Sequence, residues 1–238
     1  MKRKPEPSEE APPRPLAASR RSVLLVDDHP VMRSGLTQLI NRQPDLEVVA
    51  EAGNPAEAWT VLERRLPDLM VSDITMPGRS GLDFIKDILA RFPSLRILVL
   101  SMHDEAIYSE RALRSGARGY IMKEAGGESL LEAIRCVLRG EVYLSAAQSA
   151  RVLNGLSERR PRGSDSPIGE LTDREFEIFR LIGQGKGTRD IAEQLHLSSK
   201  TVDVHRGHIK EKLQLKDVTA LIRFAVRWTE SPGGDPSP

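Results

Sequence analysis

Length, composition and charge already exclude several classes of protein. The chain has 238 residues, enough for two ordinary domains, and its 39% hydrophobic and 29% charged residues are typical of a globular protein. Because the formal net charge is only +1, any binding to nucleic acid must depend on where the cations lie and not on bulk charge. The single cysteine, Cys136, excludes an internal disulfide and a metal–thiolate cluster.

The amino terminus and the lack of a long apolar run predict a cytoplasmic protein with no membrane partner. Residues 1–21 are rich in proline and charge but carry no hydrophobic stretch, so we expect a disordered extension and not a signal peptide. No apolar run approaches the roughly 18 residues of a membrane helix. We expect a linker with a short helix over 141–169 and a disordered tail over 230–238. The folded blocks are then 22–140 and 170–229.

Strand-like and helical patterns alternate along residues 22–140. Five short runs are almost continuously hydrophobic, as are strands that are buried on both faces of a sheet. They cover residues 22–28, 46–52, 68–73, 95–101 and 118–123. The segments between them have helical spacing, for example at Leu82, Ile85 and Leu89. This order predicts an α/β domain with a doubly wound, five-stranded parallel sheet.

Polar residues collect where these predicted strands end. They are Asp27 and Asp28 on the first strand, Asp73 on the third, Ser101 on the fourth and Lys123 on the fifth. Ligands of an open parallel sheet bind at the carboxyl ends of its strands. Because three carboxylates in one cleft repel, we expect positive charge among them, from Lys123 and from a divalent cation such as Mg²⁺. This combination suggests phosphoryl transfer to a carboxylate.

Four motifs, LLVDDHP, SDITMPGRSG, VLSMHDE and GYIMKE, occur in this order and resemble a response-regulator receiver domain, which has a flavodoxin-like sheet. The resemblance implies that Asp73 accepts a phosphoryl group from the phosphohistidine of a sensor histidine kinase. It also implies that Asp27, Asp28, Asp73 and the backbone carbonyl of Thr75 hold Mg²⁺. The break at Pro77–Gly78 would leave Asp73 exposed to its partner.

The same resemblance assigns further roles around the predicted phosphorylation site. Lys123 would neutralise one phosphoryl oxygen, and Ser101 would hydrogen-bond another. Tyr120 matches the aromatic residue whose rotamer follows the switch, although an ordinary tyrosine on a strand fits this position equally well. Thr75 and His103 lie two residues beyond Asp73 and Ser101, so we expect them to flank the attacking water and to tune dephosphorylation.

Two other functions use part of the same pattern. A haloacid-dehalogenase-like phosphatase also forms an aspartyl phosphate, but it needs a second aspartate where this chain has Thr75. A regulator that acts by protein contact, without phosphorylation, would not need the acidic residues, Ser101 and Lys123, all of which are present. We therefore expect no enzyme, apart from a receiver that catalyses its own phosphorylation and dephosphorylation.

Residues 170–229 contain helical patterns only and predict a small all-α domain of four helices. Thr172 and Glu175 form a capping box, and Thr188 and Ser198 are predicted N-caps. The signatures LTDRE, IAEQL and TVDVH, in this order, resemble the LuxR-type helix-turn-helix domain of the NarL/FixJ family of response regulators. The resemblance implies a sequence-specific transcription regulator that binds double-stranded DNA as a homodimer, under the control of a two-component system.

A helical wheel over residues 198–213 separates a core face from a DNA-facing side. Val202, Ile209 and Leu213 share the core side, with His205 at its edge. The candidates for reading bases lie opposite and are Lys200, Asp203, Val204 and Gly207. The candidates for contacting or flanking phosphates are Thr201, Arg206, Lys210 and Lys212, with Arg189 from the preceding helix. Many relatives carry lysine in place of Asp203, so we expect an unusual sequence preference or weak binding.

Overall fold

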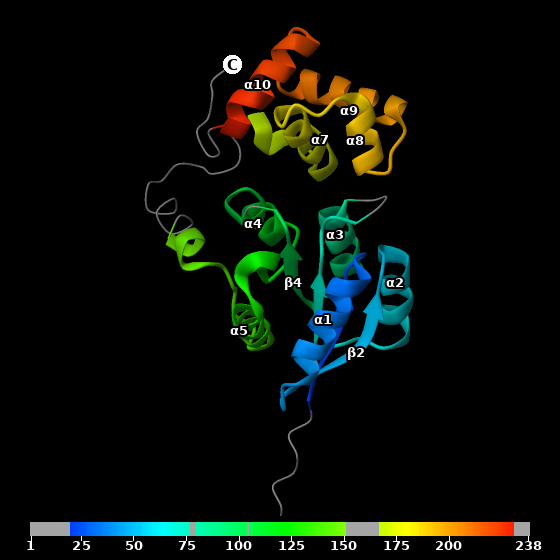
Figure 1. Ribbon diagram of the computed structural model, residues 1–238, viewed down its shortest axis with the longest axis vertical. Coiled ribbons are helices and arrows are strands. Elements are labelled where there is room, and N and C mark those ends of the chain that lie inside the picture. The colour runs from blue at the N-terminus through cyan, green and yellow to red at the C-terminus, as the bar shows by residue number, and fades with distance from the viewer. Residues whose placement is uncertain (1–19, 77–79, 104, 151–166, 231–238) are drawn as a thin grey trace, which may run out of the picture.

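The protein consists of an α/β domain joined to a smaller helical domain, as the computed structural model shows (Figure 1). The structure describes residues 20–76, 80–103, 105–150 and 167–230. Most of the predicted extension, the Pro77–Gly78 break, much of the linker and the predicted tail from residue 231 lie outside the described residues. In the described part of the linker, residues 146–150 are helical.

The amino-terminal domain is built on a parallel five-stranded sheet with the order β2-β1-β3-β4-β5. The strands are β1 (Arg21–Val26), β2 (Leu46–Ala52), β3 (Leu69–Ser72), β4 (Arg96–Ser101) and β5 (Gly119–Met122). The last four residues of β1 and all four of β3 are buried, which confirms that these runs are hydrophobic because both sheet faces are covered.

Helices cover both faces of this sheet. They are α1 (Pro30–Asn41), α2 (Pro55–Arg64), α3 (Gly81–Arg91), α4 (Glu105–Arg114) and α5 (Gly127–Leu138). Ile40 of α1 and Ile134 of α5 belong to one buried cluster, whereas α2, α3 and α4 contribute to the other. The doubly wound fold predicted from the alternating pattern is therefore confirmed.

The strand order places the ends of β1 and β3 next to each other. Because β2 lies on one side of β1 and β3 on the other, the connections from β1 and β3 diverge at this point. The backbone N–H of Asp73 donates to the carbonyl of Val26 over 2.8 Å, so the pairing continues one residue beyond β3. This bond holds the two acidic loops side by side.

The return from Asp73 into α3 depends on a glycine. A Cβ atom at Gly81 would overlap the backbone of Ile74, whose side chain is buried in the core. Only glycine lets the first turn of α3 lie this close to the loop that follows β3. The sequence SGLDF therefore brings the helix against the functional loop.

Four α-helices form the carboxy-terminal domain, preceded by the short 3-10 helix η2 (Pro167–Glu170). They are α7 (Asp173–Gly183), α8 (Thr188–Gln194), α9 (Ser199–Lys212) and α10 (Val218–Glu230). The Thr172–Glu175 capping box and the Ser198 cap are both present. The prediction that Thr188 is an N-cap is wrong: α8 begins at Thr188, and Gly187 precedes it. Gly187 has no side chain that could cap the helix. Its backbone N–H donates to the carboxylate of Asp190 in the first turn.

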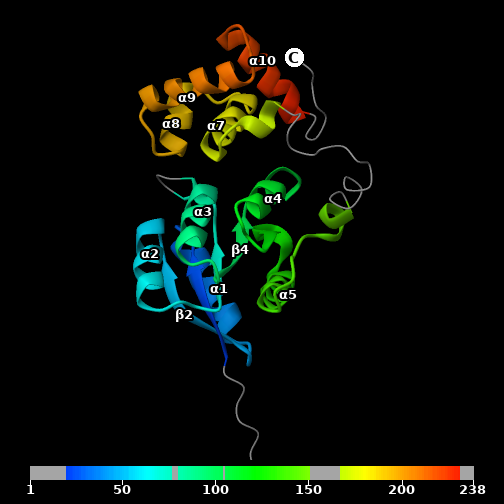
Figure 2. The ribbon, with the colours of Figure 1, turned by 180° about the vertical axis from the view of Figure 1, so that it is seen from behind.

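The helical domain lies against one end of the α/β domain, with α7 over α4 in both views (Figures 1 and 2). Tyr108 of α4 meets Phe176 of α7 edge to face, with ring centroids 5.4 Å apart. Both side chains are buried, so the two domains share an apolar contact.

In the part of the chain that the structure describes, every helix is too short or too polar to cross a bilayer.

Candidate functional site

An acidic pocket lies at the carboxyl ends of β1 and β3. Asp27 and Asp73 are 2% and 3% exposed and follow their strands directly, one residue later than the strands end. The ammonium of Lys123, which follows β5, lies 2.6 Å from Asp27 Oδ2 and 2.7 Å from Asp73 Oδ2. The structure thus brings together residues from three strands, as their positions at strand ends predicted.

Backbone N–H groups fix the remaining carboxylate oxygens. The N–H of His29 donates to Asp27 Oδ1 and that of Thr75 to Asp73 Oδ1, each over 2.8 Å. The ring of His29 also lies 2.8 Å from Asp28 Oδ1, although the side chain is largely exposed. Sequence patterns do not predict this pairing, because an exposed histidine after a strand is typical of an ordinary loop.

Burial decides the electrostatics of this pocket. It raises the pKa of Asp73 above its ordinary value, and the nearby Lys123 ammonium opposes that rise. Burial would lower the pKa of Lys123, but the two carboxylates outweigh it and raise that pKa, so the ammonium stays charged. One ammonium among three carboxylates leaves a net negative pocket.

The same pocket has the donor set for a divalent cation. Ligand atoms of Asp27, Asp28, His29 and Asp73 all lie within 4.8 Å of one another. Carboxylate oxygens at an opening toward solvent suit Mg²⁺, which keeps several waters when it binds. The three predicted aspartates are therefore assembled, and their chemistry fits the ion.

Ser101 and Tyr120 converge on the backbone of His103. The N–H of His103 donates to Ser101 Oγ over 3.2 Å, and the hydroxyl of Tyr120 donates to the carbonyl of His103 over 2.8 Å. The side chains of Tyr120 and Ser101 are both fully buried. His103 is thereby held at the rim of the acidic pocket.

The side chain of His103 joins the pocket to the helical domain. Its Nε2 lies 3.0 Å from Thr75 Oγ1, and its Nδ1 lies 3.1 Å from the guanidinium of Arg180 on α7. Burial, together with the charges of Arg180 and Lys123, lowers the pKa of His103 to about 4. The ring is therefore neutral at physiological pH.

Charged residues that the sequence analysis did not single out hold the two domains together. Asp173 of α7 accepts from Lys86 of α3 over 2.7 Å and from Arg111 of α4 over 3.1 Å. Arg111 also donates to the carbonyls of Ile168 and Leu171 and lies 4.0 Å from the ring centroid of Phe176. Sequence patterns carry no sign of such contacts, because the partners lie more than fifty residues apart.

Helix α9 has the two faces that its sequence predicts. Val202, Ile209 and Leu213, which ends the helix, are buried, and His205 lies partly buried at their edge. Lys200, Asp203 and Val204 are exposed, whereas Gly207 is partly exposed. The contacts with α4 described above come from α7, and Lys200, Asp203 and Val204 of α9 are exposed, so the candidate DNA face stays open while the domains are docked.

Several polar side chains near this face are engaged within the domain. Arg206 donates to Thr188 Oγ1 over 2.6 Å, and the hydroxyl of Thr188 donates to Asp203 Oδ1 over 3.4 Å. The base-reading candidate Asp203 is therefore oriented by α8. Arg189 is exposed, and Thr201 and Lys210 are partly exposed.

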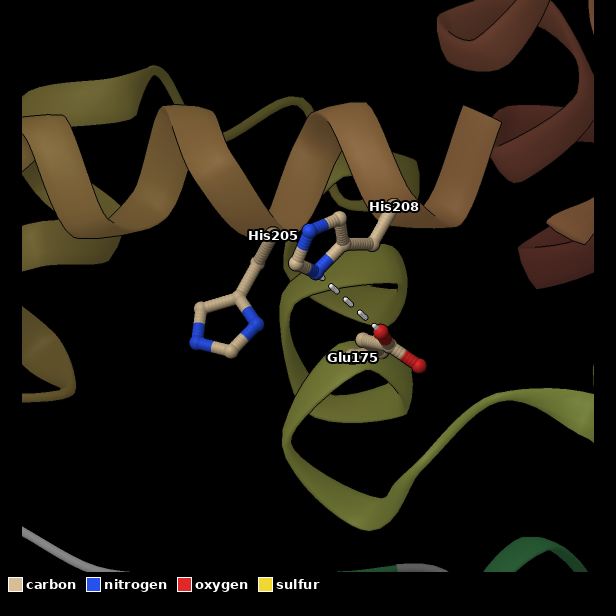
Figure 3. Close-up of side chains that lie close together, drawn as sticks. All are labelled: Glu175, His205 and His208. Atoms are coloured by element: carbon tan, nitrogen blue, oxygen red, sulfur yellow. Dashed lines mark ion pairs between the residues drawn. The ribbon is translucent and has the colours of Figure 1, made fainter. Parts of the chain in front are cut away.

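Lys212 points into its own domain instead. Its ammonium donates to Glu175 Oε2 over 2.7 Å and to the carbonyl of Glu170 over 3.3 Å. Figure 3 shows Glu175 of α7 with His208 and His205 of α9, and an ion-pair contact of 3.8 Å joins His208 to Glu175. These three residues also form a potential metal-ligand set. Since Lys212 already neutralises Glu175, we assign this cluster to the packing of α9 on α7.

Comparisons with known proteins agree with this division. The family described as "Response regulator receiver domain" matches residues 23–135, and "Bacterial regulatory proteins, luxR family" matches residues 169–225. The oxygen regulatory protein NreC of Staphylococcus carnosus (strain TM300) is 38% identical over 209 residues, which cover 86% of this chain and 96% of that protein.

Solved structures of similar proteins cover different shares of this chain. A LuxR-family two-component response regulator from Aurantimonas sp. SI85-9A1 is 33% identical, with a TM-score of 0.55, over 58% of this chain and 99% of that one. RcsB of Salmonella enterica serovar Typhimurium, bound to the promoter rprA with the phosphomimetic BeF3-, is 25% identical, with a TM-score of 0.58. The match covers 87% of this chain and 99% of that one. RcsB has also been solved as two dimers on two parallel DNAs (25% identity, TM-score 0.54).

The Glu175–Lys212 pair leads to a prediction on acid stability. Burial would raise the pKa of Glu175, but bonds from Lys212 and Thr172 outweigh it and lower that pKa below its ordinary value. The carboxylate thus stabilises the fold at neutral pH, and this contribution is lost as pH falls through the lowered pKa. We expect Lys212→Gln to reduce the free energy of unfolding by about 1–3 kcal/mol at neutral pH. The loss should shrink as pH falls through the lowered pKa and Glu175 becomes protonated.

Urea unfolding followed by Trp228 fluorescence, in a Trp59→Phe background, measures this effect in the helical domain. Lys216→Gln, at an exposed lysine between α9 and α10, is the matched control and should change little. A loss for Lys212→Gln that stays constant from neutral to acid pH would contradict the role of the pair.

Proposed function

Since the chain belongs to the response regulators that join a receiver domain to a luxR-family regulatory domain, we propose that phosphorylation of Asp73 controls its binding to double-stranded DNA. The phosphoryl donor is the phosphohistidine of a sensor histidine kinase, and the protein acts in the cytoplasm as a transcription regulator. The observation that carries the proposal is the buried Asp73 carboxylate, ion-paired with Lys123 beside two further aspartates.

Phosphoryl transfer uses the groups that surround Asp73. A carboxylate oxygen of Asp73 forms a bond to phosphorus as the bond from phosphorus to the histidine nitrogen breaks. Lys123, which already contacts Asp73, stays within reach to neutralise a phosphoryl oxygen. When held by Asp27, Asp28, Asp73 and the carbonyl of Thr75, Mg²⁺ supplies further positive charge for the same oxygens.

Ser101 links the chemistry to a conformational change. Its hydroxyl now accepts from the N–H of His103. When Ser101 turns to hydrogen-bond a phosphoryl oxygen, the segment after β4 loses this bond, and Tyr120 has to follow because its hydroxyl binds the same residue. The phosphoryl group thus stabilises a second arrangement of the loop that leads into α4.

An apolar hollow beside the pocket provides room for the kinase. It is about 680 Å³ in volume and lies between α1 and α5, next to His29 and Lys123. Val31 at its rim is 88% exposed and Met102 is 56% exposed. Exposed apolar residues in such a cluster are typical of a protein interaction site. A helix of the kinase seated here would bring its phosphohistidine toward Asp73.

The DNA-binding step uses the open face of α9. In helix-turn-helix proteins the first turns of the recognition helix enter the major groove. In α9 these turns carry Lys200, Asp203 and Val204. Thr201, Arg206, Lys210 and Arg189 flank this face toward the phosphates. We leave Lys212 out of the contact set, because its ammonium is bound to Glu175.

A homodimer on a two-fold DNA site completes the proposal. Leu221, Phe224 and Ala225 of α10 are buried in the domain core, whereas Val218 and Ile222 are 49% and 41% exposed. This second, apolar side of α10 is available to pair two helical domains. RcsB, which shares the fold, has been solved as dimers on DNA.

Phosphorylation is tested with a small phosphodonor in place of the kinase. We expect the wild type to take up one phosphoryl group per chain in the presence of Mg²⁺, and Asp73→Asn to take up none. Asp45→Asn, at the opposite edge of the sheet, is the control and should be labelled like the wild type. No labelling of the wild type would favour a regulator that acts by protein contact, and rapid multiple turnover would favour a phosphatase.

Thr75 and His103 are expected to set the lifetime of the phosphoryl group. They meet through a 3.0 Å contact at the rim of the pocket, where water must pass to reach phosphorus. Replacing both with alanine should change the rate at which labelled protein loses phosphate after the donor is removed. An unchanged rate would contradict this role.

DNA binding is tested by two substitutions on α9. Lys200→Ala should weaken binding to every DNA and flatten the salt dependence by about one unit of slope, since one positive charge that faces the DNA is removed. Asp203→Asn should instead change the preference among sites selected from a random library. Arg64→Ala, on the receiver, is the control. Equal effects of both variants on every DNA would refute this division of roles.

A further inference from the structure

The contact between His103 and Arg180 reaches from the phosphorylation pocket into the DNA-binding domain. We propose that Arg180 is a positioning residue for this pocket: by fixing the His103 ring against Thr75, the docked DNA-binding domain lengthens the life of the phosphoryl group on Asp73. The inference rests on the proposed function, because it concerns the aspartyl phosphate that this function requires.

The two contacts of the His103 ring determine its tautomer. A guanidinium group can only donate, so Nδ1, which lies 3.1 Å from Arg180, has to be the accepting nitrogen. A ring whose Nδ1 is bare carries its single proton on the other nitrogen. The Nε2–H group therefore donates to Thr75 Oγ1 over 3.0 Å.

Packing leaves the ring little freedom while Arg180 is in place. His103 stacks on Tyr108 of α4 with ring centroids 4.7 Å apart and an interplanar angle of 18°. The guanidinium of Arg180 also lies over the Tyr108 ring, 5.5 Å from its centroid. Of these contacts to the His103 ring, the one from Arg180 comes from the helical domain.

The docked arrangement of the domains delivers Arg180 to this position. Asp173, Phe176 and Arg180 follow helical spacing along one side of α7, and each contacts the receiver. Figure 1 shows this helix lying over α4. When α7 leaves, Nδ1 of His103 loses its donor, and both tautomers and other ring orientations become available.

The consequence concerns hydrolysis of the aspartyl phosphate. Water oxygen forms a bond to phosphorus, the bond from phosphorus to the Asp73 oxygen breaks, and the carboxylate and inorganic phosphate are released with one proton to solvent. The hydrogen bond between Thr75 and His103 lies at the rim of the pocket, where this water must enter. A ring that Arg180 holds in place excludes water better than a ring that turns.

The lifetime of the phosphoryl group on the full-length protein tests this inference. Arg180→Met removes the donor at similar length, and we expect phosphate loss to be faster by between about twofold and thirtyfold. Arg180→Lys keeps a donor and a charge and should restore most of the wild-type lifetime. Lys216→Met removes an exposed cation of the helical domain, between α9 and α10, so its lifetime should stay near that of the wild type.

Three outcomes would overturn the inference while leaving the proposed function intact. These are an unchanged lifetime in Arg180→Met, an equal acceleration in Lys216→Met, and no rescue by Arg180→Lys. Failure of the wild type to accept phosphate would instead contradict the proposed function itself.

Nuclear magnetic resonance of isotope-labelled histidine gives a readout that needs no phosphorylation. The chain has five histidines, and His103 is identified by the signal that disappears in His103→Gln. In the wild type we expect the proton on Nε2 and a bare Nδ1, and in Arg180→Met an averaged signal from both tautomers. A proton on Nδ1 in the wild type would overturn the inference.

Discussion

The buried ammonium of Lys123 between Asp27 and Asp73 is the interaction on which the receiver site depends. It joins the end of β5 to the ends of β1 and β3, although β4 lies between β3 and β5 in the sheet. Neither carboxylate is exposed enough for water to solvate it, so each needs this partner. Burial raises the pKa of Asp73 and the Lys123 ammonium opposes this rise, so the ion pair favours the carboxylate form that a phosphoryl acceptor requires.

His103 extends this site toward the rest of the molecule. Four groups hold it: Ser101 and Tyr120 through its backbone, Thr75 and Arg180 through its ring. A change at any of these contacts therefore reaches the others through one residue. Such a shared residue provides a physical route by which events at Asp73 and the position of the helical domain affect each other.

Helix α7 has two separate functions in the helical domain. One side packs through Ile178 and Ile182 into the core, and the other contacts the receiver through Phe176 and its charged neighbours. Because the receiver packs against α7, the exposed side of α9 stays free. Docking thus constrains the position of the domain without covering the residues proposed to read DNA.

The sequence by itself determined the sheet, its order of elements and the position of Asp27, Asp73, Ser101 and Lys123 at one edge. Strands buried on both faces are continuously apolar, and parallel strands bring their carboxyl ends together, so these features are local in origin. The two faces of α9 followed from helical periodicity for the same reason.

Only the tertiary structure decided which partner each buried face and charged side chain meets. Periodicity indicates that Phe176 is buried, but not that Tyr108 of the receiver covers it. The contact between Arg180 and His103 joins residues 77 positions apart. Likewise, Lys212 lies on a helix that suggests DNA contact, yet it binds Glu175. A long charged side chain can reach many partners, and the docking of whole elements selects one.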